Sequence, residues 1–366
     1  MRIAQITLNV YDNYGNMLQK YALNRALKKF ADSVDVLWQH STTVYLPDAL
    51  ELNLPIKKTM LDVAFRIVWQ TKIKEFNDAN ISTRFDIPYL EDLADEYDYF
   101  VIGSDQVWNP KFAVPGRFLD FAPPEKRIAY AASIAIPELP DELKETYRQK
   151  ISEMPHVSIR ESDGCDLVEK LTGKRPLHVL DPVFLLTADE WREIAKRPRW
   201  LDDKKYERGY VLTYFFGGNV PQAVKDFAAK VNLPTVNLRS VTNFNHYITG
   251  IEEFVYLIEH ANFVCTHSFH GTSFAIIFKR PFITYKVART VIEKFSRLES
   301  LLELFGLSER ATELDLKIKV ADPFEIDFSR RDEILPRERF KAFRFLARAL
   351  ETAPREKILE VTRNED

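Results

Sequence analysis

The sequence predicts an α/β protein with two doubly wound Rossmann-like domains that face a cleft, and a C-terminal helix that crosses back to the first domain. Short apolar runs alternate with amphipathic stretches, which is typical of a parallel sheet with crossover helices. The runs are continuous and bounded by Gly, Asp or Asn, as in strands buried on both faces. The pattern restarts after Leu180, Asp181 and Pro182, which indicates a domain boundary near residue 181.

The first half of the chain carries one set of predicted strands, at residues 2–8, 34–38, 99–102, 127–132 and 156–159. Between the first two, apolar residues recur at helical spacing, and Asn13 or Asn16 is available as the N-cap of that helix. Residues 46–86 contain a helical pattern around Phe65, which we interpret as an insertion or lid.

The second half carries further predicted strands, each preceded by a stretch that fits a helix, at residues 210–215, 235–238, 263–266 and 282–285. Residues 336–350 place Phe340, Phe343 and Leu346 on one face, which predicts an amphipathic helix with Pro336 in its first turn. The expected domains are residues 1–180, residues 181–330, and a terminal helix and tail at residues 331–366.

Composition narrows the class of protein. A chain of 366 residues is long enough for two α/β domains with real cores. Its 46% hydrophobic and 29% charged residues are the balance of a globular protein. The net charge of −3 gives no overall basic field for nucleic acid or an anionic membrane. An anionic ligand must therefore be bound by a local cluster of residues.

The compartment is predicted from three features. Cys165 and Cys265 show neither CxxC spacing nor a disulfide framework, which fits a reducing cytoplasm. The N-terminus is interpreted as a strand and lacks the apolar core of a signal peptide. Apolar runs such as residues 274–278 are far shorter than the roughly 20 residues of a spanning helix. We expect a cytoplasmic protein; if it works at the plasma membrane, it visits the inner face peripherally, to reach a lipid-linked substrate.

Two motifs follow predicted strands of the first half, where doubly wound folds bind ligands. Residues 13–16 (Asn-Tyr-Gly-Asn) precede the first helix, and Gly15 permits close backbone approach of an anion or a sugar hydroxyl. The alternative is a glycine turn with an Asn cap. Residues 103–109 combine a glycine, a carboxylate, amides and an indole, as a sugar-binding surface requires. The alternative is simple capping, with Trp108 in the core.

A third motif ends the predicted strand at residues 156–159. Arg160 follows this buried strand, and a buried arginine is costly unless it meets an anion. A guanidinium is also the best side-chain clamp for a carboxylate or phosphate. The neighbouring Glu161 offers an alternative, because the two residues could form an ordinary ion pair.

The fourth motif, residues 266–273, places His267 and His270 beside hydroxyls at a predicted helix start. Such a start can bind phosphate, and histidines can move protons near neutral pH. Core packing is the alternative. The His-x-x-His spacing lacks helical i, i+4 geometry, so we expect no metal. Lys286 ends the next strand, and Arg297 is either a solvated helix charge or a residue of the cleft.

Taken together, these motifs resemble the polysaccharide pyruvyl transferase family. The resemblance runs from residue 14 to about residue 300, and its strength lies in the number and order of matches at residues 14–16, 103–109, 129–133, 158–161, 179–182, 268–271 and 281–282. It implies a GT-B-like arrangement, phosphoenolpyruvate as donor and co-substrate, and a saccharide acceptor on a polysaccharide, a lipid-linked precursor or a cell-wall glycan. Residues 1–180 would form the acceptor side and residues 181–330 the donor side. No metal or organic cofactor is expected, because the donor's enol phosphate supplies the driving force.

The resemblance also implies roles for single residues. The family's donor-handling Arg, His and Lys correspond to Arg160, His270 and Lys286. Some members carry an Arg where this chain has Ser268, so another cation, Arg297 or Arg289, must supply that charge. The implied catalytic residues are His270, Arg160, Lys286, His267 and Asp105. The implied donor-binding residues are Arg160, Ser268, His270, Gly271, Thr272, Lys286 and Arg297; the implied acceptor-binding residues are Asn13, Tyr14, Gly15, Asn16, Ser104, Asp105, Gln106 and Trp108.

In the expected mechanism, His270 protonates the donor's methylene carbon, and His267 or Asp105 accepts a proton from a sugar hydroxyl. Arg160 and Lys286 hold the carboxylate and the leaving phosphate. Two other functions remain open. A nucleotide-sugar glycosyltransferase could use the same architecture, and so could a non-catalytic sugar- or anion-binding protein, which would release no phosphate.

Overall fold

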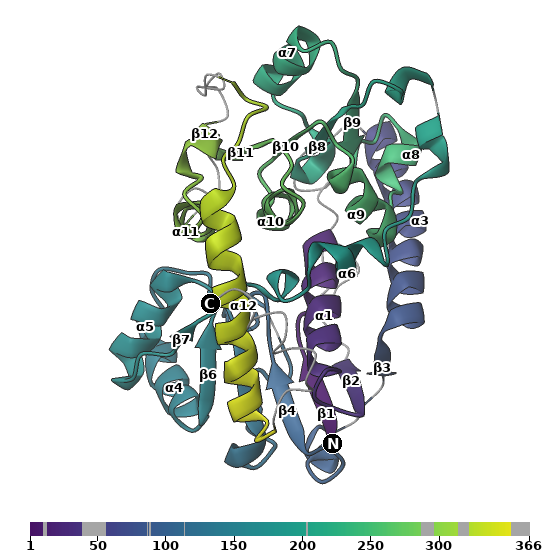
Figure 1. Cartoon of the computed structure of the whole chain (residues 1–366). Coiled ribbons are helices and arrows are strands. Elements are labelled where there is room, and N and C mark those ends of the chain that lie inside the picture. Colours follow the sequence, from purple (N-terminus) through teal and green to yellow (C-terminus); the bar gives the residue numbers. More distant parts are fainter. Residues whose placement is uncertain are drawn as a thin grey trace.

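The computed structural model describes residues 1–9, 13–38, 56–85, 87, 89–112, 114–202, 204–286, 296–313 and 322–352 (Figure 1). The described chain contains two parallel sheets. The seven-stranded sheet has the order β3-β2-β1-β4-β5-β6-β7. Its strands are β1 (Arg2–Ile6), β2 (Ser33–Trp38), β3 (Ser82–Phe85), β4 (Tyr99–Ile102), β5 (Arg127–Ala132), β6 (His156–Ile159) and β7 (Leu177–His178).

The five-stranded sheet has the order β12-β11-β10-β8-β9. Its strands are β8 (Val211–Tyr214), β9 (Thr235–Leu238), β10 (Phe263–Thr266), β11 (Phe282–Lys286) and β12 (Ala311–Glu313). The predicted α/β class with two doubly wound parallel sheets is thereby confirmed. The strand predicted at residues 2–8 ends earlier, at Ile6. The strands of the two sheets lie on either side of residue 181, while the domain limits themselves stay a prediction.

Helices connect the strands. The α-helices are α1 (Tyr14–Leu27), α3 (Ile56–Asn80), α4 (Asp141–Ser152), α5 (Ser162–Thr172), α6 (Ala188–Arg192), α7 (Gln222–Lys230), α8 (Phe244–Tyr247), α9 (Ile251–Glu259), α10 (Phe269–Ile277), α11 (Ser296–Leu304) and α12 (Ser329–Ala349). Short 3₁₀ turns are η1 (Glu91–Leu93), η2 (Pro124–Lys126), η3 (Pro182–Phe184), η4 (Arg199–Asp202), η5 (Lys204–Tyr206), η6 (Phe216–Gly218) and η7 (Ser308–Arg310).

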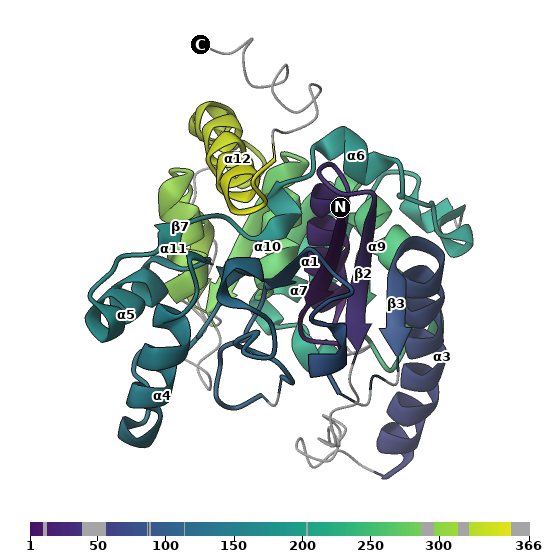
Figure 2. The same ribbon diagram turned by 90° about the horizontal axis from the view of Figure 1, so that it is seen from below.

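The segment predicted as an insertion or lid is a packed helix in its described part. Helix α3 contacts α1, which follows β1 of the first sheet, and α8 and α9, which connect β9 to β10 of the second sheet. The Trp69 indole is buried and its Nε1–H donates to the Thr249 carbonyl at 2.8 Å. The chain then enters the first sheet as β3, and Figure 2 shows α3 beside that edge strand. Residues 46–55 and 86 of the predicted segment lie outside the described residues.

The C-terminal helix crosses back to the first sheet, as predicted. Phe343, Leu346 and Leu350 pack in one apolar cluster with residues of α1, β4 and β5. The prediction placed Pro336 in the first turn, but α12 begins at Ser329 and Pro336 lies inside the helix. The residues between Ser329 and Pro336 are therefore part of the helix.

Among the described residues, no helix is both long enough and apolar enough to cross a membrane.

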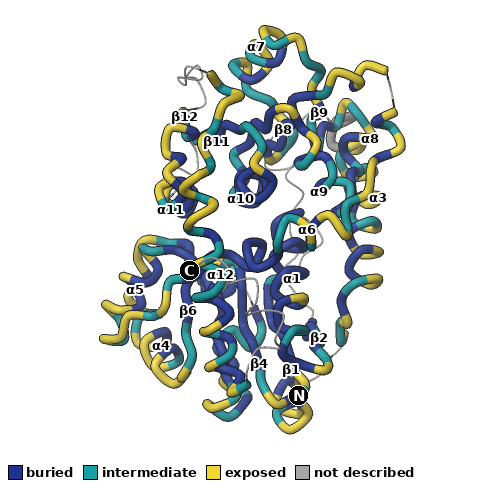
Figure 3. Tube along the Cα trace, in the orientation of Figure 1, coloured by how far each residue is buried: buried dark blue, intermediate teal, exposed yellow. Residues whose placement is uncertain are grey.

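The core joins the two halves. One apolar cluster contains Tyr14 and Met17 of α1 together with Phe254 of α9 and Phe274 of α10. Figure 3 shows α1 and α10 among the buried elements between the sheets. Apolar burial of this kind is the main favourable term in folding, so the two halves are stabilised as one packed unit. This packing brings the starts of α1 and α10 together.

Candidate active site

Doubly wound sheets bind ligands where the strand order reverses, at the carboxyl ends of the strands. In the first sheet this point lies between β1 and β4, which are followed by the start of α1 and by residues 103–105. In the second sheet it lies between β8 and β10, which are followed by η6 and by the start of α10. The two points face each other, because α1 and α10 are in contact.

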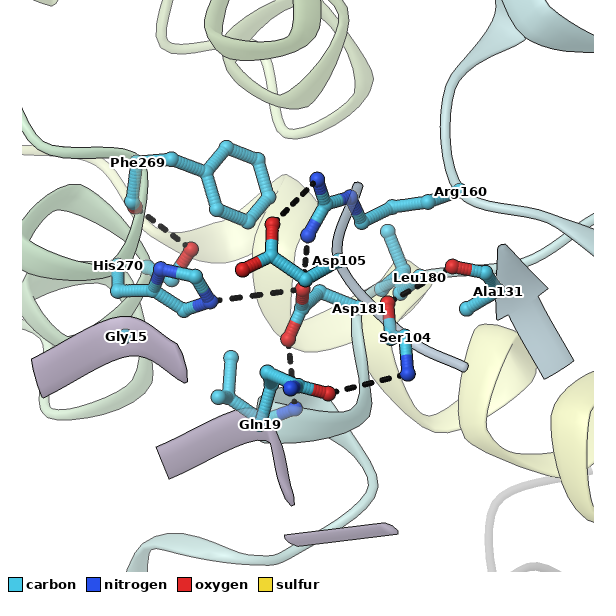
Figure 4. Close-up of polar contacts among 12 residues, drawn as sticks. Gly15, Gln19, Ser104, Asp105, Ala131, Arg160, Leu180, Asp181, Phe269 and His270 are labelled. Atoms are coloured by element: carbon cyan, nitrogen blue, oxygen red, sulfur yellow. Dashed lines mark hydrogen bonds and ion pairs between the residues drawn. The ribbon is translucent and has the colours of Figure 1, made fainter. Parts of the chain in front are cut away.

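Arg160 forms the centre of a buried polar cluster (Figure 4). It follows β6 directly, and its side chain is 2% exposed. Its Nη1–H donates to Asp181 Oδ2 at 2.8 Å, and its Nη2–H donates to Asp105 Oδ1 at 3.4 Å. The Nε atom lies 3.8 Å from Glu161 Oε2, and the guanidinium carbon lies 5.2 Å from the centre of the Phe269 ring. The guanidinium is therefore already surrounded by carboxylates.

Asp105 is held in place by backbone contacts. Its φ of 68° lies in the left-handed region, and it forms an isolated parallel bridge with Ala132 of β5. Its carbonyl accepts hydrogen bonds from the Val107 and Ser133 amides at 2.7 and 3.1 Å. These contacts turn the chain sharply after β4 and aim the carboxylate at Arg160.

Gln19 of α1 supports the turn before Asp105. Its Oε1 accepts a hydrogen bond from the Ser104 amide at 3.0 Å, and its Nε2 donates to Thr7 Oγ1 at 3.0 Å. The Ser104 hydroxyl donates to the Ala131 carbonyl at 2.7 Å. These residues are fully or almost fully buried, so they fix the loop rather than line a surface.

His270 lies against the first turn of α1. A Cβ atom added to Gly15 would stand 1.9 Å from His270 Nδ1, so the ring occupies the space of a missing side chain. On its other side, Nε2 lies 3.5 Å from Asp181 Oδ2. Asn13 caps α1 by accepting from the Gly15 amide at 2.7 Å, and Ser268 caps α10 by accepting from the Gly271 amide at 3.3 Å. Two helix N-termini, each with a partial positive charge, thus begin at this ring.

The electrostatics of the cluster follow from burial and close charges. Burial alone would raise the pKa of Asp105, but Arg160, His270 and Arg297 outweigh it and lower that pKa. Asp181 behaves alike: burial opposes the shift, yet His270 and Arg160 hold its pKa far below the usual range. Both carboxylates are therefore ionised at neutral pH. Burial opposes the charged form of Arg160, but Asp105, Asp181 and Glu161 raise its pKa overall.

Arg297 behaves differently from Arg160. It is 9% exposed on α11, and burial together with repulsion from Arg160 lowers its pKa to about 10. Attraction to Glu161, Asp105 and Asp181 offsets part of this shift. Its buried Nε has no hydrogen-bond partner within the described part of the chain. Because the side chain is buried, Arg297 is not a solvated helix charge, and its place in a cleft stays a prediction.

Two predicted residues lie against other partners. His267 accepts a hydrogen bond from the Phe216 amide at Nε2, at 3.4 Å, and its ring stacks on Phe215. Lys286 at the end of β11 pairs with Glu299 at 2.8 Å and lies 3.9 Å from a Glu313 oxygen. Arg160 and His270 thus both contact the carboxylate of Asp181. The ion pairs of Lys286 named above are with two other carboxylates, those of Glu299 and Glu313. Arg289 lies outside the described residues.

Several predicted contact residues are buried, and their side chains contact other parts of the protein. Tyr14 is 0% exposed, stacks on Phe254 and donates to the Thr249 carbonyl at 2.7 Å. Trp108 is also 0% exposed and donates to the Arg117 carbonyl at 2.7 Å. Thr272 bonds Thr284 of β11 at 2.7 Å, and Asn16 is 2% exposed. These side chains organise the site from within. Gln106 is half-buried, and its Oε1 accepts from Asn109 at 2.8 Å.

Asp181 is the main residue that sequence reasoning missed. The sequence placed it in a boundary motif and in the family match at residues 179–182 without giving it a role, yet it contacts both Arg160 and His270. A carboxylate directly after an apolar run and before Pro182 was the available signal. Glu161 was the alternative partner of Arg160: its Oε2 lies 3.8 Å from Arg160 Nε, while its Oε1 accepts from the Ile134 and Ala135 amides at 3.1 and 3.2 Å. Among the described residues, no group of three or more His, Cys, Asp or Glu side chains is arranged to hold a metal ion.

Comparisons with known proteins agree with the sequence motifs. The family model of polysaccharide pyruvyl transferase matches residues 13–287, a range that includes Asp105, Arg160, Asp181 and His270. A search of curated protein sequences gives no significant match.

Solved structures show only distant similarity. UDP-GlcNAc 2-epimerase from Neisseria meningitidis shares 12% identity, with 96% of this chain and 99% of that chain covered and a TM-score of 0.43. ADP-heptose LPS heptosyltransferase II from E. coli shares 12% identity, with 95% and 99% covered and a TM-score of 0.37. The glycotransferase of kitacinnamycin shares 13% identity, with 100% and 97% covered and a TM-score of 0.38. Similarities at this level carry no argument about activity.

Proposed function

Since this chain belongs to the polysaccharide pyruvyl transferase family, we propose that it transfers the pyruvyl group of phosphoenolpyruvate to two hydroxyls of one sugar. The product is a cyclic ketal on a polysaccharide, a lipid-linked precursor or a cell-wall glycan, and phosphate is released. The observation that carries this proposal is the buried acid–base cluster, in which Asp105, Arg160 and His270 meet from elements of both sheets. Proton transfer and charge stabilisation in a dry cleft are what the reaction needs.

The proposed reaction is balanced without a further reactant. A proton adds to the methylene carbon of the enol, whose double-bond electrons form the new C–H bond, and C2 becomes electrophilic. The first hydroxyl adds at C2 and loses its proton, which replaces the one given to the methylene. The second hydroxyl displaces phosphate, and its proton leaves with the phosphate. The enol phosphate provides the driving force, so no cofactor is proposed.

His270 and Asp105 are the proposed acid and base. His270 is buried and lies beside the N-termini of α1 and α10. Its imidazole can deliver a proton to the methylene carbon. Asp105 is ionised and shares the cluster with His270, so it can accept the proton of a hydroxyl. The known contacts of His267 are with Phe215 and Phe216. We assign the base role to Asp105 because its carboxylate lies in the same buried cluster as His270 and is bonded to Arg160.

Arg297 is the proposed clamp for the anionic donor. The hydrogen bonds of Arg160 already go to Asp181 and Asp105, so its role is fixed positive charge. Arg297 is buried beside Arg160, and an incoming anion would relieve the repulsion between the two guanidiniums. The partial positive charges at the starts of α1 and α10 add to this preference. The acceptor sugar would then lie nearer the first sheet, beside Asp105 and Gln106.

The proposed location is the cytoplasm, with a lipid-linked acceptor reached at the membrane surface. Cys165 and Cys265 are buried free thiols, which suits a reducing compartment.

A direct assay tests the proposal. The protein is incubated with phosphoenolpyruvate and a panel of nitrophenyl or lipid-linked sugars that carry diols, and phosphate and product mass are measured. We expect phosphate release that depends on the acceptor, together with a product heavier by one pyruvyl ketal. Phosphoenolpyruvate should also raise the melting temperature. The matched control replaces the donor with nucleotide sugars; turnover or stabilisation by these alone would favour a glycosyltransferase instead.

A further inference from the structure

Asp181 occupies an unusual place in the chain. It lies between β7 and η3, where the chain passes from the first sheet to the second, and it is 0% exposed. Its Oδ1 accepts from the Val183 amide at 3.1 Å, and its Oδ2 accepts from Arg160 Nη1 at 2.8 Å. With one oxygen held by a backbone amide and the other by a guanidinium, the carboxylate cannot rotate freely. The oxygen that faces His270 is therefore fixed.

The two ring nitrogens of His270 face different neighbours. Nε2 lies 3.5 Å from Asp181 Oδ2, whereas Nδ1 lies against Gly15, in the space of the absent side chain. An ionised carboxylate accepts protons but donates none, so it favours the ring form with hydrogen on Nε2. In the neutral ring Nδ1 is then the acceptor, and in the protonated ring the Nδ1 proton is the one not committed to Asp181.

We propose that Asp181 is the positioning residue of the site: it fixes the Nε2–H tautomer of His270 and so presents Nδ1 as the atom that exchanges a proton with the substrate. This inference rests on the proposed function for the identity of that substrate. The Nδ1–H bond breaks as the methylene C–H bond forms with the electrons of the enol double bond. The Nε2 proton stays between the ring and Asp181, and the carboxylate stabilises the imidazolium before it reacts.

A purely structural role is the alternative. Asp181 could be an ion-pair partner of Arg160 that ties the halves together, and its removal would then lower stability alone. The two roles differ in what they do to the His270 ring. Only a positioning role changes the tautomer of the free protein and lowers kcat without a matching change in donor affinity.

The test uses Asp181→Asn, which keeps the shape of the side chain and removes its charge. Nitrogen-15 histidine spectra of the unliganded protein report the tautomer of each ring, and a His270→Gln variant identifies the His270 signals. We expect Nε2–H in the wild type and a shift toward Nδ1–H, or a mixture, in Asp181→Asn. We also expect kcat to fall by roughly 10²-fold, with the donor KM changed less than about threefold.

The matched control is Asp332→Asn. Asp332 lies on α12, and its Oδ2 is 2.6 Å from Lys279 Nζ, so the variant removes the charge of a carboxylate in an ion pair elsewhere in the protein. It should alter neither the tautomer nor kcat. A wild-type His270 with hydrogen on Nδ1 would overturn the proposal even if Asp181→Asn fails to fold. An Asp181→Asn protein that only melts earlier, with the wild-type tautomer and kcat, would overturn it too. A shifted tautomer in a protein that releases no phosphate from phosphoenolpyruvate would support the positioning role while refuting the proposed reaction.

Discussion

The two halves of the molecule bring side chains of different net charge to the site. The first sheet and its connector supply the carboxylates Asp105, Glu161 and Asp181, with Arg160 between them. The second half supplies His270 and Arg297. Three carboxylates thus face two guanidiniums, and the cluster is balanced when the His270 ring carries a proton.

This difference separates the two chemical tasks. Carboxylates suit an acceptor hydroxyl, because they accept hydrogen bonds and protons, while cations and helix N-termini suit an anionic donor. This distribution of charge is what the predicted acceptor side in the first half and donor side in the second would require. The assignment of the two sides is still a prediction. Substitutions in the two halves should therefore change different kinetic constants.

The largest effect is expected for His270→Gln, on the second half. Gln is similar in size but transfers no proton near neutral pH, so kcat for phosphate release should fall by roughly 10²–10⁴-fold. Acceptor-dependent phosphate release measures the effect, and circular dichroism checks the fold. If the folded variant turns over at a rate close to wild type, His270 is not the acid.

The next effect is expected for Gly15→Ala, on the first half. The added Cβ would stand 1.9 Å from His270 Nδ1, so the ring has to move. A misplacement of about 1 Å can cost about 10²-fold in rate, so kcat should fall by that order while the variant stays folded.

Gly250→Ala is the matched control for Gly15→Ala. Gly250 precedes α9, and a Cβ there would meet its nearest atoms at 3.7 Å, which is ordinary contact. Its kcat should stay within about twofold of wild type, because Gly250 has φ −81° and ψ −177°, which alanine adopts without strain, and the added methyl displaces no neighbour. Equal losses in both variants would mean that the Gly15 contact is not special.

A smaller effect, confined to donor binding, is expected for Arg297→Gln. Loss of a charged partner of a phosphate or carboxylate should raise the donor KM about tenfold or more, with a weaker effect on kcat. Steady-state kinetics at saturating acceptor separate the two constants. If the acceptor KM rises while the donor KM is unchanged, the assignment of sides to the two halves is reversed.

Local chemistry made most strands predictable. The strands at residues 99–102, 127–132, 235–238 and 263–266 have the predicted bounds, because each is a short apolar run with polar neighbours. The strands that escaped prediction, such as β3 and β7, are short and partly exposed at the sheet edge, so no continuous apolar run marks them. Pro336 misled the prediction of α12, since a proline usually marks a helix start rather than a helix interior.

The site was predictable only where residue type and position act locally. His270, Arg160 and Asp105 each follow a strand, and a strand end is visible in the sequence. Tyr14 was predicted to touch the acceptor, but its partners Trp69 and Phe254 come from distant segments and bury it. The role of Asp181 likewise depends on residues from two other elements: the local pattern marks the carboxylate, but it does not show that Arg160 and His270 contact it.

The smallest effect is expected for Lys286→Met, and it tests the family-implied role of this residue. Lys286 is about one-third exposed and pairs with Glu299 at 2.8 Å, and exposed pairs of this kind contribute little. If its charge serves only that pair, the donor KM should change less than about threefold. A rise comparable to that of Arg297→Gln would mean that Lys286 leaves Glu299 to bind the donor. The second half would then present two cations to the anion, and the contrast between the halves would be sharper than the unliganded contacts indicate.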